Sequence, residues 1–494
     1  MKKNPVTFKN IGLLGLVSFL ACTGFILYSI REVGTVGFPL DDAWIHHTFA
    51  RNFAQDLTWS FQQGQPSGGS TGPLWGFLLS MLYFLRIPAV WGTHFLGFLL
   101  LWACAVTAYL AARRILRGRE LPAVLVGAMI GLEWHLVWSA LSGMETLLMI
   151  LIALLVFLWT LQKRDDWWVP GILTGITIWI RPDGITLIGP VLFCLLFRKG
   201  SIRKRFTYAV MFLGSLLIVA APYFLFNQVV AGDLWPNTFY AKQAEYEVLR
   251  QAGLLKRYAR LSLQIMTGVG IALLPGLIIE AAAIVSRKDW EAAGMLLWGV
   301  GYVGIYAWRL PVVYQHGRYI MPAIPALLIL GAVGLAGWVQ FKSSRSWKRV
   351  LSAVWASAAG AVLITFWWLG AKAYALDVGV IETEMVRTAK WIKENTAEEA
   401  VIGAHDIGGL GYYSEREILD LAGLISPDVI PFIRDQEQLG IYLEQKGADY
   451  LVTFPSWYPE LVKDLDPVYE SGGEFSPLFG MDEMTVYLWR SKGD

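Results

Sequence analysis

Residues 11–30 of this chain read IGLLGLVSFLACTGFILYSI and contain no charged side chain. A helix rises about 1.5 Å per residue, so a run of this length crosses the roughly 30 Å hydrocarbon layer of a bilayer. Residues 206–226 and 350–369 repeat the pattern further along the chain. The sequence therefore predicts an integral membrane protein whose chain crosses the bilayer several times.

The composition of the whole chain agrees with this prediction. Hydrophobic residues make up 55% of the 494 residues and charged residues only 16%, whereas a soluble protein carries about a quarter charged residues. The net charge is only +2, with the basic residues in short clusters, so we expect membrane lipid and no nucleic acid as a partner. Cys22, Cys104 and Cys194 lie inside apolar segments, which predicts neither a disulfide nor a zinc site.

Charge decides the predicted topology, because Lys and Arg are enriched in cytoplasmic connections. About twelve apolar blocks are candidate crossings, and they begin at residues 11, 72, 90, 121, 145, 168, 184, 206, 263, 291, 319 and 349. The basic connections are Lys2-Lys3, 113–119, Lys163-Arg164, 198–205, Arg287-Lys288 and 342–349.

Parity then removes one crossing. An even number of crossings must separate the cytoplasmic N-terminus from the basic cluster at 113–119, yet three candidates occupy that interval. The weakest is 72–85, which is short and bounded by proline, so we expect a re-entrant or interfacial helix there. The result is about eleven crossings in the inner (plasma) membrane, with an extracytoplasmic C-terminus.

The fold class predicted is mostly α: a polytopic transmembrane helical bundle followed by a small α/β domain. Charged residues become frequent near residue 377, which divides the chain into a transmembrane domain, 1–376, and a soluble extracytoplasmic domain, 377–494. The larger outer loops are 31–71 and 227–262. In the soluble domain the pattern predicts a helix over 382–394, a strand over 400–404, a helix over 436–446 and a strand over 450–454.

Two adjacent carboxylates, Asp41 and Asp42, lie just beyond the first crossing. Carboxylates are costly next to hydrocarbon, which favours a functional role: a general base that accepts a proton from a hydroxyl while its neighbour orients it. The structural alternative is a cap on the next helix, where Asp is favoured. Desolvation and the like charge are both expected to raise the pKa of this pair.

Other predicted outer connections also place ionisable side chains beside Gly or Pro at the membrane boundary. Each alone suits an interfacial anchor or a helix end, but carboxylates beside isolated cations together suit a phosphorylated substrate and a proton acceptor. The expected substrate-binding residues are His46, Arg51, Glu145, Arg181, Asp183, Asn237, Tyr240, Lys242, His316, Arg318 and Tyr319.

Two further clusters have weaker support as site residues. Glu133 and His135 could reach the site but also suit hydrogen bonds within the bundle, and His405-Asp406 suits a turn contact or a lid. The chain has no nucleotide-type Gly-rich loop, metal-binding helix motif or serine nucleophile elbow. We therefore expect no cofactor and no metal; a divalent cation is compatible with the acidic pair but not indicated.

Several motifs resemble those of GT-C superfamily membrane glycosyltransferases, in particular bacterial members similar to the terminal arabinofuranosyltransferase. The first-loop motifs are Asp41-Asp42-Ala43-Trp44-Ile45, Phe49-Ala50-Arg51-Asn52 and Ser70-Thr71-Gly72-Pro73-Leu74-Trp75. Further matches are 142–146, 181–184, 236–242, Arg318-Tyr319, 406–408 and 420–424. The resemblance thus covers most of the chain, although His46-His47 departs from the small or hydroxyl residues expected after the first motif.

This resemblance implies a polyprenyl-phosphate-linked sugar donor and a glycan, lipid or protein acceptor. It also implies a catalytic aspartate in the first loop, Asp41 or Asp42, and inverting displacement at the sugar carbon. Arg181, Lys242 and Arg318 are then expected at the lipid phosphate.

Two other functions remain open at the level of sequence. A flippase or transporter of lipid-linked sugars would share the bundle, but it would place charges at mid-membrane and show repeat symmetry. A noncatalytic scaffold whose outer domain binds glycan or protein would have no need of the acidic pair.

Overall fold

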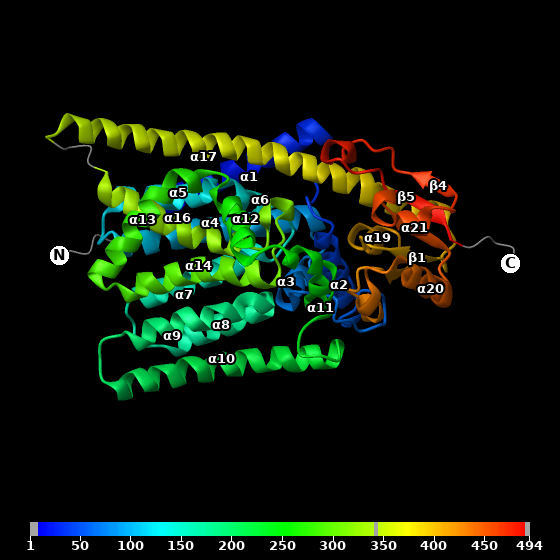
Figure 1. Cartoon of the computed structure of the whole chain (residues 1–494), viewed down its shortest axis with the longest axis horizontal. Coiled ribbons are helices and arrows are strands. Elements are labelled where there is room, and N and C mark those ends of the chain that lie inside the picture. Colours follow the sequence, from blue (N-terminus) through cyan, green and yellow to red (C-terminus); the bar gives the residue numbers. More distant parts are fainter. Residues whose placement is uncertain (1–7, 340–343, 490–494) are drawn as a thin grey trace.

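The computed structural model describes residues 8–339 and 344–489. Helices fill one end of the molecule, and a small sheet with short helices fills the other (Figure 1). The predicted basic residues Lys2, Lys3 and Lys342 lie outside the described residues. Mostly helical structure with a small sheet towards the C-terminus confirms the predicted fold class at this level.

The helical part precedes the sheet in the sequence. Its α-helices are α1 (Phe8–Val33), α2 (Asp42–Asp56), α3 (Pro73–Phe84), α4 (Ala89–Ile115), α5 (Glu120–Leu132), α6 (Trp134–Ala140), α7 (Thr146–Leu161), α8 (Trp168–Ile180), α9 (Ile188–Leu196), α10 (Ile202–Val230), α11 (Asn237–Glu245), α12 (Leu254–Met266), α13 (Val269–Arg287), α14 (Trp290–Arg309), α15 (Tyr314–Gly317), α16 (Ile324–Trp338) and α17 (Ser346–Val380). Short 3₁₀ turns η1 (Pro182–Leu187), η2 (Glu247–Gln251) and η3 (Met321–Ala323) join some of them.

Fewer helices meet the length and composition of a membrane span than the sequence predicts. Among the described residues, six helices are long and apolar enough to cross a bilayer, or seven if the bent pair α5 and α6 counts as one span. Helices α3, α7 and α8 and the segment Pro182–Leu196 are apolar but shorter. The predicted count of about eleven crossings is therefore not confirmed. Helix α3 has 12 residues, about 18 Å, which is short for a crossing as its pattern indicates.

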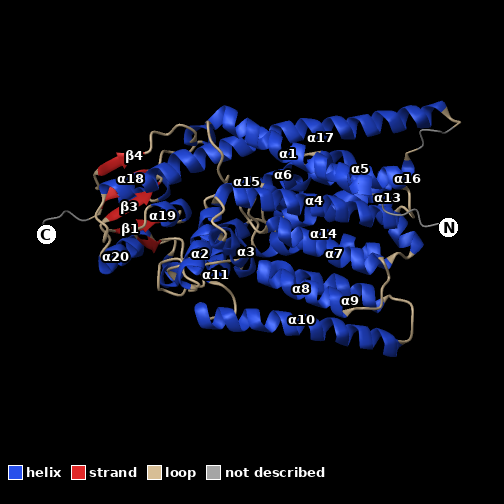
Figure 2. Ribbon diagram, turned by 180° about the vertical axis from the view of Figure 1, so that it is seen from behind, coloured by secondary structure: helices blue, strands red, loops and turns tan. Residues whose placement is uncertain are grey.

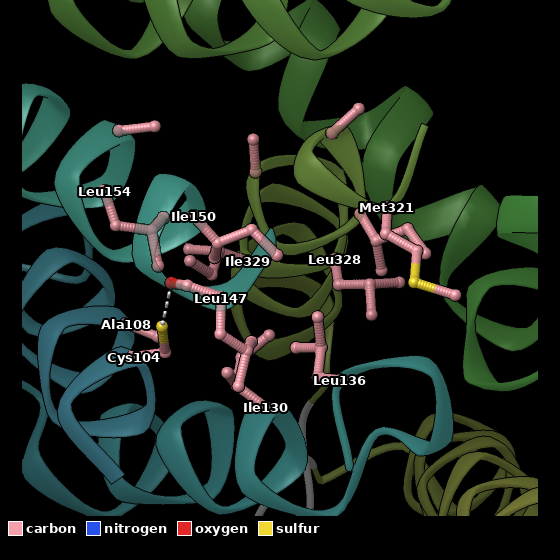
Figure 3. Packing of buried hydrophobic residues seen from close by; sticks show 14 of the residues in the cluster. Cys104, Ala108, Ile130, Leu136, Leu147, Ile150, Leu154, Met321, Leu328 and Ile329 are labelled. Atoms are coloured by element: carbon pink, nitrogen blue, oxygen red, sulfur yellow. Dashed lines mark hydrogen bonds between the residues drawn. The ribbon is translucent and has the colours of Figure 1, made fainter. Parts of the chain in front are cut away.

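Apolar side chains from helices distant in sequence form the main core of the bundle. Figure 3 shows Cys104 and Ala108 of α4 beside Leu147 of α7. The Cys104 thiol lies 3.7 Å from the carbonyl of Leu147. All three cysteines are buried and free of disulfides, as their apolar surroundings predict.

The sheet has five short strands in the order β2-β1-β3-β5-β4. These are β1 (Val401–Ala404), β2 (Glu417–Asp420), β3 (Tyr450–Thr453), β4 (Pro467–Glu470) and β5 (Thr485–Leu488). Strand β1 runs parallel to β2 and β3, and β5 runs antiparallel to β3 and β4. Helices α18 (Arg387–Asn395), α19 (Gly408–Tyr413), α20 (Gln436–Lys446) and α21 (Pro459–Val462) surround it (Figure 2), with turns η5 (Pro427–Phe432), η6 (Pro455–Trp457) and η7 (Ser476–Phe479) between them.

The local predictions here are partly confirmed. Strands β1 and β3 and helix α20 lie where the pattern predicts them. The helix predicted over 382–394 is real but not separate, because α17 continues through a π-helical turn, η4 (Ile381–Val386), into α18. The predicted boundary at residue 377 therefore lies inside a continuous helix that joins the bundle to the sheet (Figure 1).

Candidate active site

A cavity of about 490 Å³ lies among the loops and helices at the end of the bundle that faces the sheet. Helix α11 and the last turn of α14 contribute to its wall. Its lining includes the predicted site residues Asp42, Glu145, Arg181, Asp183, Lys242, Arg318 and Tyr319. Residues far apart in the sequence thus meet around one space.

Asp42 begins helix α2, and its carboxylate is held by two cations. Its Oδ2 atom lies 2.8 Å from Nη2 of Arg318 and 3.6 Å from Nζ of Lys242. Burial alone would raise the pKa of Asp42, but the charges of Arg318 and Lys242 outweigh it and hold that pKa well below its usual range. The expected rise in pKa is therefore wrong for this member of the pair.

Arg318 is buried yet incompletely paired within the described structure. Its Nη2 atom also donates to the hydroxyl of Tyr319 at 3.1 Å, whereas its Nε and Nη1 atoms have no hydrogen-bond partner. A buried donor without a partner is costly, and a guanidinium presents donors in a fork that matches an anionic oxygen pair. This geometry suits an anion that enters the cavity.

Arg181 also lines the cavity, but unlike Arg318 it is paired with two carboxylates. Its guanidinium donates to Glu145 at 3.2 Å, to Asp183 at 3.1 Å and to the Tyr306 hydroxyl at 3.1 Å. Tyr302 and Tyr306 also donate to Asp183. Two carboxylates neutralise this one cation, so the network holds η1 and α14 together and leaves Arg181 little capacity for a ligand.

Asp41 precedes Asp42 but points to the sheet-bearing end. Its two carboxylate oxygens accept backbone N–H bonds from Gly408 at 2.6 Å and Gly409 at 2.7 Å. At Gly408 a Cβ would lie 2.0 Å from the Asp41 carbonyl oxygen, so only glycine permits this approach. Asp41 is at the N-cap position of α2 but makes no side-chain cap hydrogen bond. The capping alternative is therefore wrong for Asp41.

The pKa of Asp41 also differs from that of its neighbour. Burial, together with the nearby Asp406 carboxylate, raises the pKa of Asp41 against the two backbone N–H bonds that favour its ionised form. The expected upward shift thus holds for Asp41 and not for Asp42. Because Asp41 is engaged with the backbone and is not among the cavity-lining residues, its raised pKa does not by itself make it the base.

Arg51 holds the other end of α19. Its Nη1 atom donates to the carbonyl oxygen of Tyr412 at 2.7 Å, and its guanidinium lies 4.7 Å from the centre of the Tyr412 ring. Asp41 and Arg51 therefore bind α19 at its N-terminal and C-terminal ends, which fits the direction of the helix dipole. We name this pair of contacts the α19 clamp.

The remaining predicted site residues also lie away from the cavity lining. His46 is buried and pairs with Glu145 at 3.2 Å, Asn237 begins α11, and Tyr240 donates to Asp233 at 2.7 Å. His316 Nε2 lies 2.8 Å from Oδ2 of Asp377.

The weaker candidates make contacts within their own regions or across the junction. His135 pairs with Glu133 at 2.8 Å, and Glu133 caps α6. His405 bonds to the Tyr458 hydroxyl at 2.7 Å and faces Glu245 of α11 at 3.7 Å, which is a contact between the sheet domain and the cavity wall.

Several cavity residues were not among the predicted site residues, although Thr71, Thr238 and Phe239 lie inside motifs that the sequence analysis singled out. They are Thr71, Thr238, Gln243, Tyr306, Arg309 and the apolar side chains Ile185, Trp235, Phe239, Ile305, Trp308 and Leu310, among others. Tyr302 and Tyr306 are spaced i, i+4 in an apolar helix, which puts both hydroxyls on one face. That spacing is the signal that could have identified Tyr306. Within residues 8–339 and 344–489, no three His, Cys, Asp or Glu side chains form a group that could hold a metal ion.

Residues 375–487 match the family described as Domain of unknown function (DUF8728). No relative was found among curated protein sequences.

Solved structures match along almost the whole chain. ArnT from Cupriavidus metallidurans, bound to undecaprenyl phosphate, is 16% identical with a TM-score of 0.59, covering 97% of this chain and 98% of that one. The archaeal oligosaccharyltransferase AglB from Archaeoglobus fulgidus, in complex with an inhibitory peptide and a dolichol-phosphate, is 12% identical with a TM-score of 0.61, covering 90% and 69%. Arabinofuranosyltransferase AftD from Mycobacteria is 16% identical with a TM-score of 0.57, covering 99% and 42%.

These neighbours are all GT-C glycosyltransferases. At such low identity the likeness concerns the arrangement of the chain, and it spans both the bundle and the sheet. This chain is an integral membrane protein with the GT-C fold.

Proposed function

We propose that this protein is a membrane glycosyltransferase that moves a sugar from a polyprenyl-phosphate-linked donor to a hydroxyl of a glycan, lipid or protein acceptor. The observation that carries the proposal is the juxtaposition of Asp42 with Lys242 and with Arg318, whose Nε and Nη1 atoms have no partner. A base beside two cations in one cavity matches a reaction in which a hydroxyl loses a proton and a phosphate leaves.

The reaction assigned to this site is a direct displacement. The acceptor oxygen attacks the sugar carbon that carries the phosphate, and the bond between that carbon and the phosphate oxygen breaks. Its electron pair stays on the polyprenyl phosphate, where Arg318 and Lys242 stabilise the charge, and the acceptor proton passes to Asp42. One displacement inverts the configuration at the sugar carbon and requires no covalent intermediate.

The contacts of Asp42 suggest the order of events: donor binds first, and Asp42 accepts the proton afterwards. In the unliganded protein, Arg318 and Lys242 keep Asp42 ionised but a weak base, because they hold its pKa low. A donor phosphate competes for the same two cations and so releases the carboxylate. Asp42 then becomes a stronger base only when donor is bound, which suppresses proton uptake in the empty site.

The cavity wall and the structural neighbours support a lipid-linked donor. Ile185, Ile305 and Trp308 line the cavity and are also among the exposed large hydrophobic residues of the molecule, as a site open to lipid requires. Undecaprenyl phosphate is bound to ArnT, and a dolichol-phosphate to AglB.

We also propose on which side of the membrane the cavity and the sheet domain lie. We place the cavity and residues 377–494 on the extracytoplasmic side of the inner membrane, because the positive-inside rule assigns the basic connections, such as 113–119 and 198–205, to the cytoplasmic side. The acceptor then reaches the cavity from outside the cell, between the first loop and the sheet domain.

Replacing both cations that are proposed to bind the phosphate, Lys242 and Arg318, tests the proposal. The Lys242→Gln/Arg318→Gln variant should raise the donor KM by roughly one to two orders of magnitude, since a hydrogen bond to a charged group contributes about 1.5–3 kcal/mol. Arg260→Gln is the matched control, because Arg260 is an exposed cation on α12 outside the cavity lining. An unchanged donor KM in the double variant, with a normal acceptor KM, would place the phosphate elsewhere.

A further inference from the structure

The turn that precedes Arg318 has an unusual backbone. Gln315 and His316 have φ angles of 51° and 60°, and Gly317 follows at 66°. The left-handed region is unfavourable for residues with a Cβ atom, and two such residues in succession need support from the surrounding structure. The residue after this turn is Arg318, which pairs with Asp42 in the cavity lining.

The His316 side chain supplies a tether for that turn. Its Nε2 atom bonds to Oδ2 of Asp377 at 2.8 Å, and the indole N–H of Trp138 donates to the same oxygen at 2.8 Å. The edges and faces of Trp134 and Trp138 enclose the imidazole at centroid distances of 5.2 and 5.4 Å. The ring is thus fixed from α6 on one side and from α17 on the other.

We propose that His316 is a positioning residue: through Asp377 it holds the left-handed turn 315–317, and this turn places the Arg318 guanidinium over the cavity. The inference rests on the proposed function of Arg318 as a ligand of the donor phosphate. His316 itself is not among the cavity-lining residues, so it acts on the phosphate only through Arg318.

The tether has a second consequence. Asp377 belongs to α17, which continues through Ile381–Val386 and α18 into the sheet domain. The position of Arg318, the cation proposed to bind the phosphate, is therefore tied to the same helix that leads into the sheet domain. Asp42 is tied to it separately, through the α19 clamp at the preceding residue.

Alanine and glycine at position 316 distinguish positioning from ordinary packing. Both remove the imidazole, but glycine adopts the left-handed region readily whereas alanine does not. If His316 acts by holding the turn, His316→Gly should bind phosphate more tightly than His316→Ala. A packing role predicts the reverse or equality, because glycine removes one more carbon and loosens the chain.

The measurement is the affinity of the purified full-length protein for undecaprenyl phosphate in detergent. His316→Ala and Asp377→Asn should each weaken binding about tenfold, within the range for a hydrogen bond to a charged group. The double variant should bind no more weakly than His316→Ala alone, because the proposed tether needs both side chains and is already lost in the single variant. Additive losses, or a glycine variant no better than alanine, would overturn the positioning role.

Two controls separate the possible failures. Lys163 also has a left-handed backbone, with φ 58°, and an ion pair, 3.4 Å from Glu291, but it lies in another connection and outside the cavity lining. Lys163→Ala and Lys163→Gly should leave phosphate affinity unchanged. Arg318→Gln tests the premise: if it binds undecaprenyl phosphate like the unsubstituted protein, the phosphate site and the inference both fail. If it weakens binding while His316→Ala does not, only the inference fails.

Discussion

The surroundings of Asp42 and of Asp41 differ in how completely their polar groups are satisfied. Around Asp41 the contacts are complete: both carboxylate oxygens accept backbone N–H bonds, and Arg51 binds the far end of the same short helix. Around Asp42 the pairing is partial, because Arg318 keeps two donors without partners beside an open cavity. Fully paired polar groups suit a structural contact that holds two domains together. Polar groups with unused donors suit a binding site, where a ligand supplies the missing hydrogen-bond partners.

The largest expected effect separates the two carboxylates. Asp42→Asn should lower turnover by roughly 10² to 10⁴, because the amide cannot accept the proton, while donor binding persists. Asp41→Asn should retain more activity but lose stability, since one backbone N–H is left facing an amide group. Transfer assays on purified variants, paired with thermal unfolding, give both quantities. Full activity in Asp42→Asn, with loss in Asp41→Asn, would reverse the assignment.

A second prediction concerns Arg181, which the sequence places with Lys242 and Arg318. Arg181→Gln should leave Glu145 and Asp183 without their shared cation, which costs about 3–5 kcal/mol for a buried charge network. Thermal unfolding should therefore detect a large loss of stability. The donor KM of the folded fraction should rise less than in Arg318→Gln. A donor defect at unchanged stability would show that Arg181 does contact the phosphate.

The α19 clamp predicts a smaller effect on the junction itself. Arg51→Ala removes a charge-assisted hydrogen bond to the Tyr412 carbonyl, with about 1.5–3 kcal/mol at stake. Limited proteolysis should cut between the bundle and the sheet faster, while the bundle stays intact. Lys393→Ala is the control, because its ion pair with Glu415 lies within the sheet domain. Equal cleavage in both variants would argue against a clamp.

The smallest expected effect is a difference between the pH profiles of kcat and of kcat/KM. The pKa of Asp42 is held low by its two cations, so in the free protein the carboxylate stays ionised as pH falls well below neutral. Donor phosphate draws those cations away, and the pKa of Asp42 in the complex rises. The acid limb of kcat should therefore lie at higher pH than that of kcat/KM. Coincident limbs would mean that phosphate does not compete for Arg318 and Lys242.

The sequence predicts those features that depend on local pattern. Residues 11–30 indicate a membrane helix because length and apolarity suffice for a span, and the helix over 436–446 is found where its pattern puts it. The strands of residues 417–420, 467–470 and 485–488 were missed, because each has only four residues and so carries little periodicity.

The sequence predicts which residues belong to the site but not how they are arranged around it. Asp41 and Asp42 are equivalent in sequence, and residues far along the chain separate them: Gly408, 367 residues away, binds Asp41, whereas Arg318 pairs with Asp42. Likewise the sequence grouped Arg181 with Arg318, since both are isolated cations. Their difference lies in Tyr302, Tyr306 and two carboxylates that packing brings to one of them.

We propose that Lys242 and Arg318 hold the phosphate of a lipid-linked sugar beside Asp42. Native mass spectrometry of the protein released from detergent tests it most directly, since a bound lipid reports its own mass. We expect a copurified polyprenyl phosphate or its glycosyl ester in the unsubstituted protein and in Asp42→Asn, and its loss in Lys242→Gln/Arg318→Gln. Retention of the same lipid by that double variant, at the occupancy of the unsubstituted protein, would contradict the claim.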